Sequence, residues 1–60
     1  MPTLREWRDK QNLTVLQLAE QSGITRGTIY GIEKGNHWPT RRTIRALAKA
    51  LGVKPEDIEF

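Results

Sequence analysis

The sequence predicts an all-α fold, a compact bundle of four to five short helices. Three observations predict this fold class. Apolar residues recur three and four positions apart in separate segments, which is the spacing of an amphipathic helix. A threonine precedes each of four such segments, in the position of a helix N-cap. Glycines follow three of them as stop signals, and no linker or internal repeat interrupts the chain, so we expect one domain over residues 1–60.

The first helix is predicted from Leu4 to Gln11. Thr3 and Glu6 have the spacing of a capping box, in which each side chain bonds the backbone N–H of the other residue. Trp7 lies three positions after Leu4, so we expect it on the inward face, as part of the core rather than as a platform for a ligand. Leu13 follows the helix and is expected to close over it.

The central segment, residues 15–32, has the form of two short helices joined by a sharp turn. Thr14 caps a helix over about 15–22, and Gly23 is expected to end it in the left-handed conformation. Thr25 caps the next helix over about 26–34. Two short helices with a glycine turn and matched apolar faces form a helix-turn-helix unit. The residues of those apolar faces are Leu18, Ala19, Ile29 and Ile32.

A loop and a fourth helix follow this unit. Turn-forming residues fill 35–39, and Thr40 caps a helix over about 41–51 that Gly52 ends. Pro55, followed by acidic residues, predicts a last short helical turn. The inward stripe of the fourth helix consists of Ile44, Leu47, Ala48 and Leu51.

The net charge of +3 is distributed unevenly along the chain. Residues 1–24 have no net charge, residues 25–54 carry seven basic side chains against Glu33 alone, and residues 55–60 carry three acidic ones. Positive charge that begins with the second helix of the unit is typical of a protein that binds nucleic acid. An ordinary solvated surface is the alternative explanation of the same charges.

The composition argues against several other classes of protein. There is no cysteine, and the apolar runs are too short to cross a membrane. The one histidine, His37, lies in a predicted loop without a second ligand or an orienting partner. We therefore expect no catalytic residue, no metal and no cofactor, in a cytoplasmic protein that is not an enzyme.

The chain resembles the helix-turn-helix DNA-binding domains of the Cro and C1 repressors, the XRE-like family. The resemblance covers nearly the whole sequence, from Leu4 to about Phe60. It implies a lambda-repressor-like fold and a transcriptional regulator, similar to a repressor, that binds double-stranded DNA in a sequence-specific way. The positions that carry it are Ala19, Gly23, Ile29, Ile32, the whole segment 23–35, Pro39 and the segment 43–53.

The helix at about 26–34 is predicted to enter the major groove, since this mode of DNA binding places the N-terminal residues of a helix at base edges. The guanidinium of Arg26 can bond O6 and N7 of one guanine, a pair worth about 1–3 kcal/mol of discrimination. Tyr30 offers a hydroxyl and a ring to a thymine methyl or a sugar. By the resemblance, the base-reading positions are Arg26, Gly27, Tyr30 and Gly31, with Thr28 at a phosphate-contacting position.

Contacts to DNA phosphates are expected from hydroxyls, cations and the loop after this helix. Arg41 and Arg42 open the fourth helix, where cations oppose the helix dipole, so one of them is expected to bind an external anion. Solvated arginines are the alternative. The expected phosphate contacts are Thr25, Thr28, Lys34, Asn36, His37 and Arg41.

The sequence departs from the family pattern at the predicted DNA face. Val15 stands where the family commonly has a glutamine that touches DNA. Gly27 and Gly31 occupy base-reading positions, where they either bring the helix backbone closer to the groove or leave specificity to few side chains.

By resemblance, we expect a homodimer that reads two half-sites about 34 Å apart. No small-molecule effector is evident. A second hypothesis is a protein-interaction or antitoxin-like module that keeps the fold, with Leu16, Trp38 and the C-terminal apolar residues as its contact face. The dimer contact is expected in the C-terminal part, from Leu51, Val53, Ile58 and Phe60.

Overall fold

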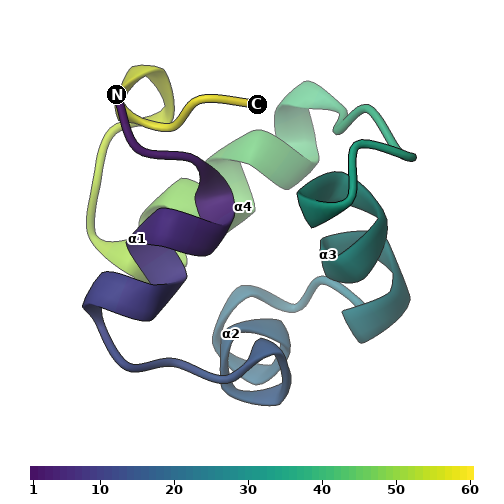
Figure 1. Ribbon diagram of the computed structural model, residues 1–60, viewed down its shortest axis with the longest axis horizontal. Helices are drawn as coiled ribbons and strands as arrows, with labels where there is room; N and C mark the ends of the chain where they lie inside the picture. The colour runs from purple at the N-terminus through teal and green to yellow at the C-terminus, as the bar shows by residue number, and fades with distance from the viewer.

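The computed structural model describes residues 1–60 and confirms an all-α fold. Figure 1 shows the two chain termini at one side of the molecule and α2 at the opposite side. One isolated parallel bridge joins Thr3 to Glu59, and the N–H of Glu59 donates to the carbonyl of Pro2 at 2.8 Å. The elements in order are α1 (Leu4–Lys10), α2 (Val15–Ser22), α3 (Arg26–Glu33), α4 (Arg41–Leu51) and the 3-10 turn η1 (Pro55–Asp57).

The predicted threonine caps are confirmed, which explains why the helices begin where they do. Thr3 and Glu6 form a complete capping box, with N···O distances of 2.8 and 3.2 Å. Thr14 forms a second box with Gln17. The hydroxyls of Thr25 and Thr40 each accept a bond from the backbone N–H three residues later.

Helix ends follow the predicted glycines, with two differences of one residue. Gly23 and Gly52 are C-caps in the left-handed region, with φ of 76° and 73°. The first helix ends at Lys10 and the third at Glu33, one residue earlier than predicted, because Gln11 and Lys34 are themselves the C-caps.

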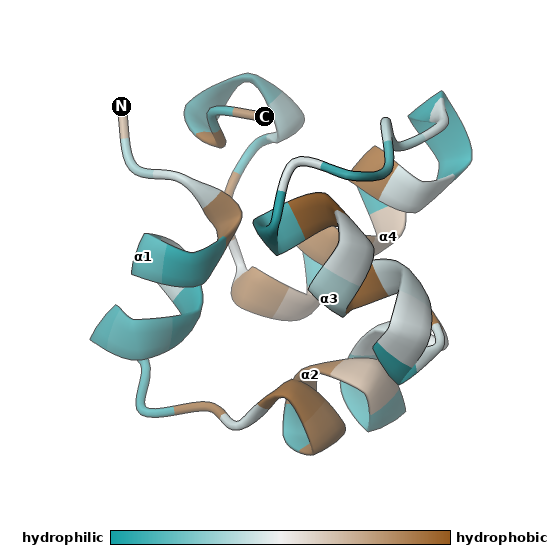
Figure 2. Ribbon diagram, turned by 45° about the vertical axis from the view of Figure 1, so that its right-hand side comes forward, coloured by the Kyte–Doolittle hydropathy of each residue, from teal (hydrophilic) through white to brown (hydrophobic).

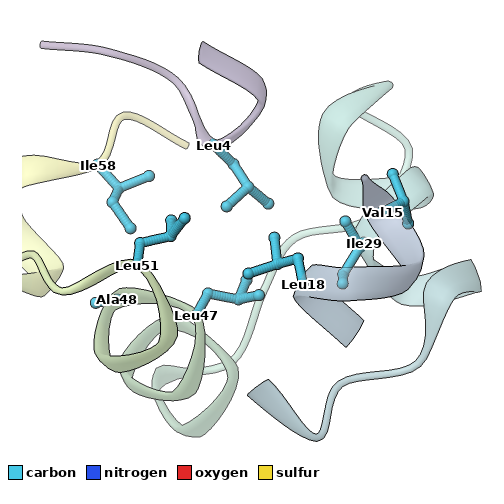
Figure 3. Close-up of a cluster of buried hydrophobic side chains, with 8 residues drawn as sticks. All are labelled: Leu4, Val15, Leu18, Ile29, Leu47, Ala48, Leu51 and Ile58. Atoms are coloured by element: carbon cyan, nitrogen blue, oxygen red, sulfur yellow. The ribbon is translucent and has the colours of Figure 1, made fainter. Parts of the chain in front are cut away.

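The core gathers one face of every helix (Figure 3). Leu18, Ile29 and Leu47 have no exposed surface, and they come from α2, α3 and α4 respectively. α2 packs against both α3 and α4, and α3 also packs against α1, which sets which face of α3 remains outside. Figure 2 shows hydrophobic stretches in α2, α3 and α4, whereas α1 is mostly hydrophilic. The eight core residues are Leu4, Val15, Leu18, Ile29, Leu47, Ala48, Leu51 and Ile58.

The expected dimer contact is wrong for two of its four residues. Leu51 and Ile58 are each only 4% exposed and belong to the core, because the chain after α4 folds back and covers that helix. Their apolar surface is therefore already used within the domain. Val53 and Phe60 are partly buried and pack against the same core.

Two side-chain bonds attach α1 to the C-terminal part of the chain. The indole N–H of Trp7 donates to the carbonyl of Asp57 at 2.8 Å, and the amide of Gln11 donates to the carbonyl of Leu51 at 2.7 Å. Trp7 is half-buried against the core, as the helical spacing predicted. No helix is both long and apolar enough to cross a bilayer.

Candidate nucleic-acid interface

The outer face of α3 is the centre of the candidate interface. Ile29 is completely buried and Ile32 packs against the core, so these two residues fix the rotation of the helix. Arg26 and Gly27 are exposed at its N-terminal end, and Tyr30 is 50% exposed one turn later. The face that the sequence assigned to base reading therefore points to solvent at these three positions.

The two glycines of α3 have different surroundings. A Cβ built on Gly27 meets nothing within 4 Å, so the backbone there is open to a close approach from outside. A Cβ built on Gly31 lies 3.0 Å from the Cβ of His37. The carbonyl of Gly31 also accepts bonds from the N–H groups of Asn36 and His37, at 2.8 and 3.1 Å. Gly31 therefore lets the loop after α3 pack against the helix.

Hydroxyl groups lie at the N-terminal end of α3. The side chain of Thr25 donates to the hydroxyl oxygen of Thr28 at 2.9 Å and accepts the N–H of Thr28 at 3.3 Å. The hydroxyl proton of Thr28 remains available for an acceptor such as a phosphate oxygen. The helix N-terminus adds backbone N–H groups without partners inside the helix, which favour an anion.

The loop and the start of α4 supply exposed polar side chains next to this face. Lys34, Asn36, His37 and Arg41 are all exposed. The two bonds to the carbonyl of Gly31 fix the backbone of the loop, so Asn36 and His37 extend from a held position. Four of the six predicted phosphate contacts thus lie at the C-terminal end of α3, in the loop and at the start of α4, and the other two, Thr25 and Thr28, lie at the N-terminal end of α3.

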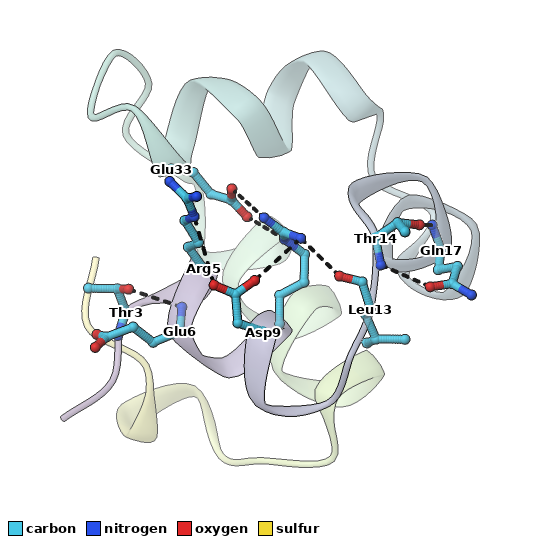
Figure 4. Close-up of polar contacts among 9 residues, drawn as sticks. Thr3, Arg5, Glu6, Asp9, Leu13, Thr14, Gln17 and Glu33 are labelled. Atoms are coloured by element: carbon cyan, nitrogen blue, oxygen red, sulfur yellow. Dashed lines mark hydrogen bonds and ion pairs between the residues drawn. The ribbon is translucent and has the colours of Figure 1, made fainter.

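An ion pair that spacing did not reveal fixes α3 to α1. The guanidinium of Arg8 donates from Nε to Oε2 of Glu33 at 2.9 Å and from Nη2 to Oε1 at 3.1 Å. Its Nη1 donates to the carbonyl of Leu13 at 2.9 Å. In Figure 4 these bonds run as dashed lines to Glu33 and Leu13, which come from separate parts of the chain. The bonds to Glu33 raise the pKa of Arg8 above its usual value, because they stabilise the charged guanidinium.

This ion pair changes the charge balance of the interface. Glu33 is the only acidic residue between 25 and 54, and Arg8 already compensates it. The remaining ion pairs join Arg5 and Arg8 to Asp9, all within α1. None of the seven basic residues of this segment forms an ion pair inside the domain: Arg26, Lys34, Arg41, Arg42, Arg45, Lys49 and Lys54.

Val15 takes part in the core rather than in the interface. Its side chain is only 6% exposed and belongs to the buried apolar cluster. The N-terminal end of α2 is instead capped by Thr14 and Gln17, whose side chains bond each other's backbone N–H groups. Val15 therefore contributes to the stability of the fold and offers no side chain to the predicted DNA face.

The fold and this face define a small helix-turn-helix protein whose second helix has one exposed face and whose seven basic residues between 25 and 54 form no ion pair. A family model described as helix-turn-helix matches residues 4–58. The chain therefore belongs to the Cro/C1-type helix-turn-helix family of DNA-binding transcriptional regulators.

Named relatives agree with the family assignment. An uncharacterized HTH-type transcriptional regulator of Methanocaldococcus jannaschii is 44% identical over 55 residues, which are 92% of this chain and 83% of that protein. The HTH-type transcriptional repressor RghR of Bacillus subtilis is 40% identical over 58 residues, 95% of this chain and 43% of that protein. The immunity repressor protein of Bacillus phage phi105 is 36% identical over 47 residues, 78% of this chain and 33% of that protein. No solved structure matched this chain.

Proposed function

We propose that this domain regulates transcription as a homodimer that binds double-stranded DNA in the cytoplasm, without catalysis and without a cofactor. Each copy inserts α3 into the major groove of one half-site. The observation that supports this most is the combination of an exposed N-terminal half of α3 with seven basic residues that have no ion-pair partner in the domain.

Base reading is assigned to the N-terminal half of α3. Arg26 contacts a guanine through both nitrogens of its guanidinium fork, and Tyr30 contacts a thymine methyl or a sugar one turn later. Gly27, which has open space beside it, brings the helix backbone close to the base edges. Gly31 is covered by the loop, so its part in base reading is limited to what its backbone can reach.

Phosphate contacts hold the domain on the duplex and set its register. They come from both ends of α3, from the loop and from the start of α4. The residues are Thr25, Thr28, Lys34, Asn36, His37 and Arg41, all with exposed or half-exposed side chains.

Selection from a random pool of duplex DNA at two salt concentrations tests the proposal. We expect enrichment of a short palindrome, with binding that weakens steeply as salt rises, because cation–phosphate contacts release counterions. Enrichment without a palindrome would refute the dimer. Absence of binding at low salt would refute DNA recognition and favour the protein-interaction module, for which the exposed Leu16 and Trp38 are the specific observation.

Two substitutions distinguish base reading from phosphate contact. Arg26→Ala should cost about 1–3 kcal/mol on the selected site and relax its sequence preference, whereas Arg26→Lys should keep the charge but lose the paired contact. Lys34→Ala should weaken binding to all sequences alike and reduce the salt slope by about one. Lys10→Ala removes the same charge from α1 and serves as the control. An Arg26→Ala protein with unchanged preference would contradict the assignment of α3.

A further inference from the structure

Trp38 is the most exposed large aromatic side chain of the domain. It lies in the loop between α3 and α4 and is 77% exposed, whereas Trp7 is half-buried. The indole N–H of Trp7 donates to the carbonyl of Asp57, and Lys10 lies over the Trp7 ring, 5.1 Å from its centroid. Within the domain the N–H of Trp38 has no acceptor and its ring has no cation. Both the ring and the N–H of Trp38 are therefore available to a partner outside the domain.

The backbone on both sides of Trp38 is held in place. Before it, the N–H groups of Asn36 and His37 donate to the carbonyl of Gly31 at 2.8 and 3.1 Å. After it, Pro39 is buried. An indole that extends from a fixed loop loses little conformational freedom when a partner covers it, so more of the contact energy remains as affinity.

The surroundings of Trp38 favour an anionic partner. Trp38, Asn36 and His37 line one cleft of about 480 Å³ past the C-terminal end of α3, and no side chain that lines this cleft is acidic. The sequence also has no acidic residue between Lys34 and Pro55. A polyanion that carries apolar groups, such as a sugar–phosphate backbone, fits these surroundings better than a protein surface of mixed charge.

We propose that Trp38 is a further DNA-contacting residue, whose ring packs against a deoxyribose of the backbone and whose N–H donates to a neighbouring phosphate oxygen. The proposal rests on the proposed function and adds a contact to it. His37 directly precedes Trp38 and Arg41 follows it by three residues, and both are proposed phosphate contacts. A DNA strand that passes from one of them to the other runs past the indole.

This contact differs from the two other kinds of contact on the proposed DNA face. The sugar–phosphate backbone is the same at every base pair, so Trp38 adds affinity without sequence preference, unlike Arg26. The indole carries no charge and releases no counterion from DNA, unlike Lys34. Loss of the indole should therefore weaken binding to all sequences alike and leave its dependence on salt unchanged.

Binding to the selected site and to an unrelated duplex, each measured at several salt concentrations, tests the contact. Trp38→Ala should weaken binding to both duplexes by about tenfold and leave the salt slope unchanged. Trp38→Phe keeps a ring and removes the N–H, so it should weaken binding by about threefold. Trp7→Phe makes the same change on α1 and is the matched control, which should bind both duplexes as wild type does. Circular dichroism verifies that each variant is folded.

Tryptophan fluorescence measures the same contact independently of affinity. In Trp7→Phe, where Trp38 is the only tryptophan, emission should move to shorter wavelength when duplex is added, because the indole leaves water. Trp38→Phe should show no such shift, because the remaining Trp7 is half-buried and hydrogen-bonded in the free domain. Unchanged emission from DNA-bound Trp7→Phe would overturn the proposal.

Each other result overturns the proposal in a recognisable way. A loss confined to the selected site means that Trp38 reads bases, and a smaller salt slope means that its replacement displaces the charged contacts of the loop. No loss on either duplex places Trp38 outside the DNA contact and favours a protein partner for it. In these cases wild-type binding still supports the proposed function, whereas a wild type that binds no duplex at low salt refutes both.

Discussion

Replacing Arg8 with alanine should destabilise the domain by about 2–3 kcal/mol, because it leaves the part-buried Glu33 carboxylate without its partner. Two charge-assisted bonds of 2.9 and 3.1 Å join these side chains, and a third bond of 2.9 Å joins Arg8 to the carbonyl of Leu13. The Arg8 and Glu33 side chains are only 13% and 7% exposed, so water screens the pair little. All three bonds disappear in Arg8→Ala.

This loss is large relative to the stability of a small domain. At about 0.05–0.15 kcal/mol per residue, a chain of 60 residues unfolds with about 3–9 kcal/mol. Arg8→Ala should therefore remove a large share of that stability. Removing both charges, with Arg8→Met and Glu33→Met together, should cost less than the single Arg8→Met change, because no unpaired charge remains buried.

The assay is urea unfolding followed by far-ultraviolet circular dichroism. Arg5→Ala is the matched control on the same helix: Arg5 is 72% exposed and meets Asp9 at 3.8 Å, so its loss should change the free energy of unfolding by less than about 0.5 kcal/mol. An Arg8→Ala protein within about 0.5 kcal/mol of wild type would refute the reasoning. A double variant less stable than Arg8→Met would refute it as well.

Two further predictions concern the glycines of α3 and the cap of α1. Gly27→Ala should stabilise the domain by up to about 1 kcal/mol in thermal unfolding, because its new Cβ meets nothing. Gly31→Ala should destabilise it, because its new Cβ lies 3.0 Å from the Cβ of His37, and the bonds from Asn36 and His37 to the Gly31 carbonyl hold that loop in place. A backbone bond from Thr3 lowers the pKa of Glu6 below its usual 4.5. The ionised Glu6 side chain therefore adds its full contribution to the free energy of unfolding above about pH 4.5, and this contribution is lost as the pH falls through the lowered pKa. Glu6→Gln should remove this pH dependence when the free energy of unfolding is measured across the acid range.

The helices could be predicted from the sequence because their signals are local. Thr3 with Glu6, and Thr14 with Gln17, satisfy backbone N–H groups within a single turn, so the spacing alone carries the information. The predicted ends of the first and third helices are one residue too late, at Gln11 and Lys34. Both residues are C-caps, and a cap residue shares part of the helical geometry, so the sequence does not separate it from the last residue of the helix.

The tertiary contacts could not be predicted in the same way. Arg8 and Glu33 are 25 residues apart, and no periodicity connects them. The sequence around an apolar residue such as Ile58 does not show whether its side chain packs into its own core or against a partner. The path of the chain after α4 determines that Ile58 packs into its own core. The difference between Gly27 and Gly31 likewise depends on where the loop folds.

The Arg8–Glu33 pair connects the stability of the fold with the charge of the proposed DNA-binding face. A carboxylate at the end of α3 would repel phosphates if it stood alone, but a cation 2.9 Å away cancels most of its field beyond the immediate contact. The cation that neutralises Glu33 is Arg8, which lies in residues 1–24. None of the basic residues between 25 and 54 is therefore needed to neutralise Glu33. One contact thus ties α3 to α1 and leaves the seven basic side chains of residues 25–54 without an ion-pair partner, which favours the proposed contact with DNA.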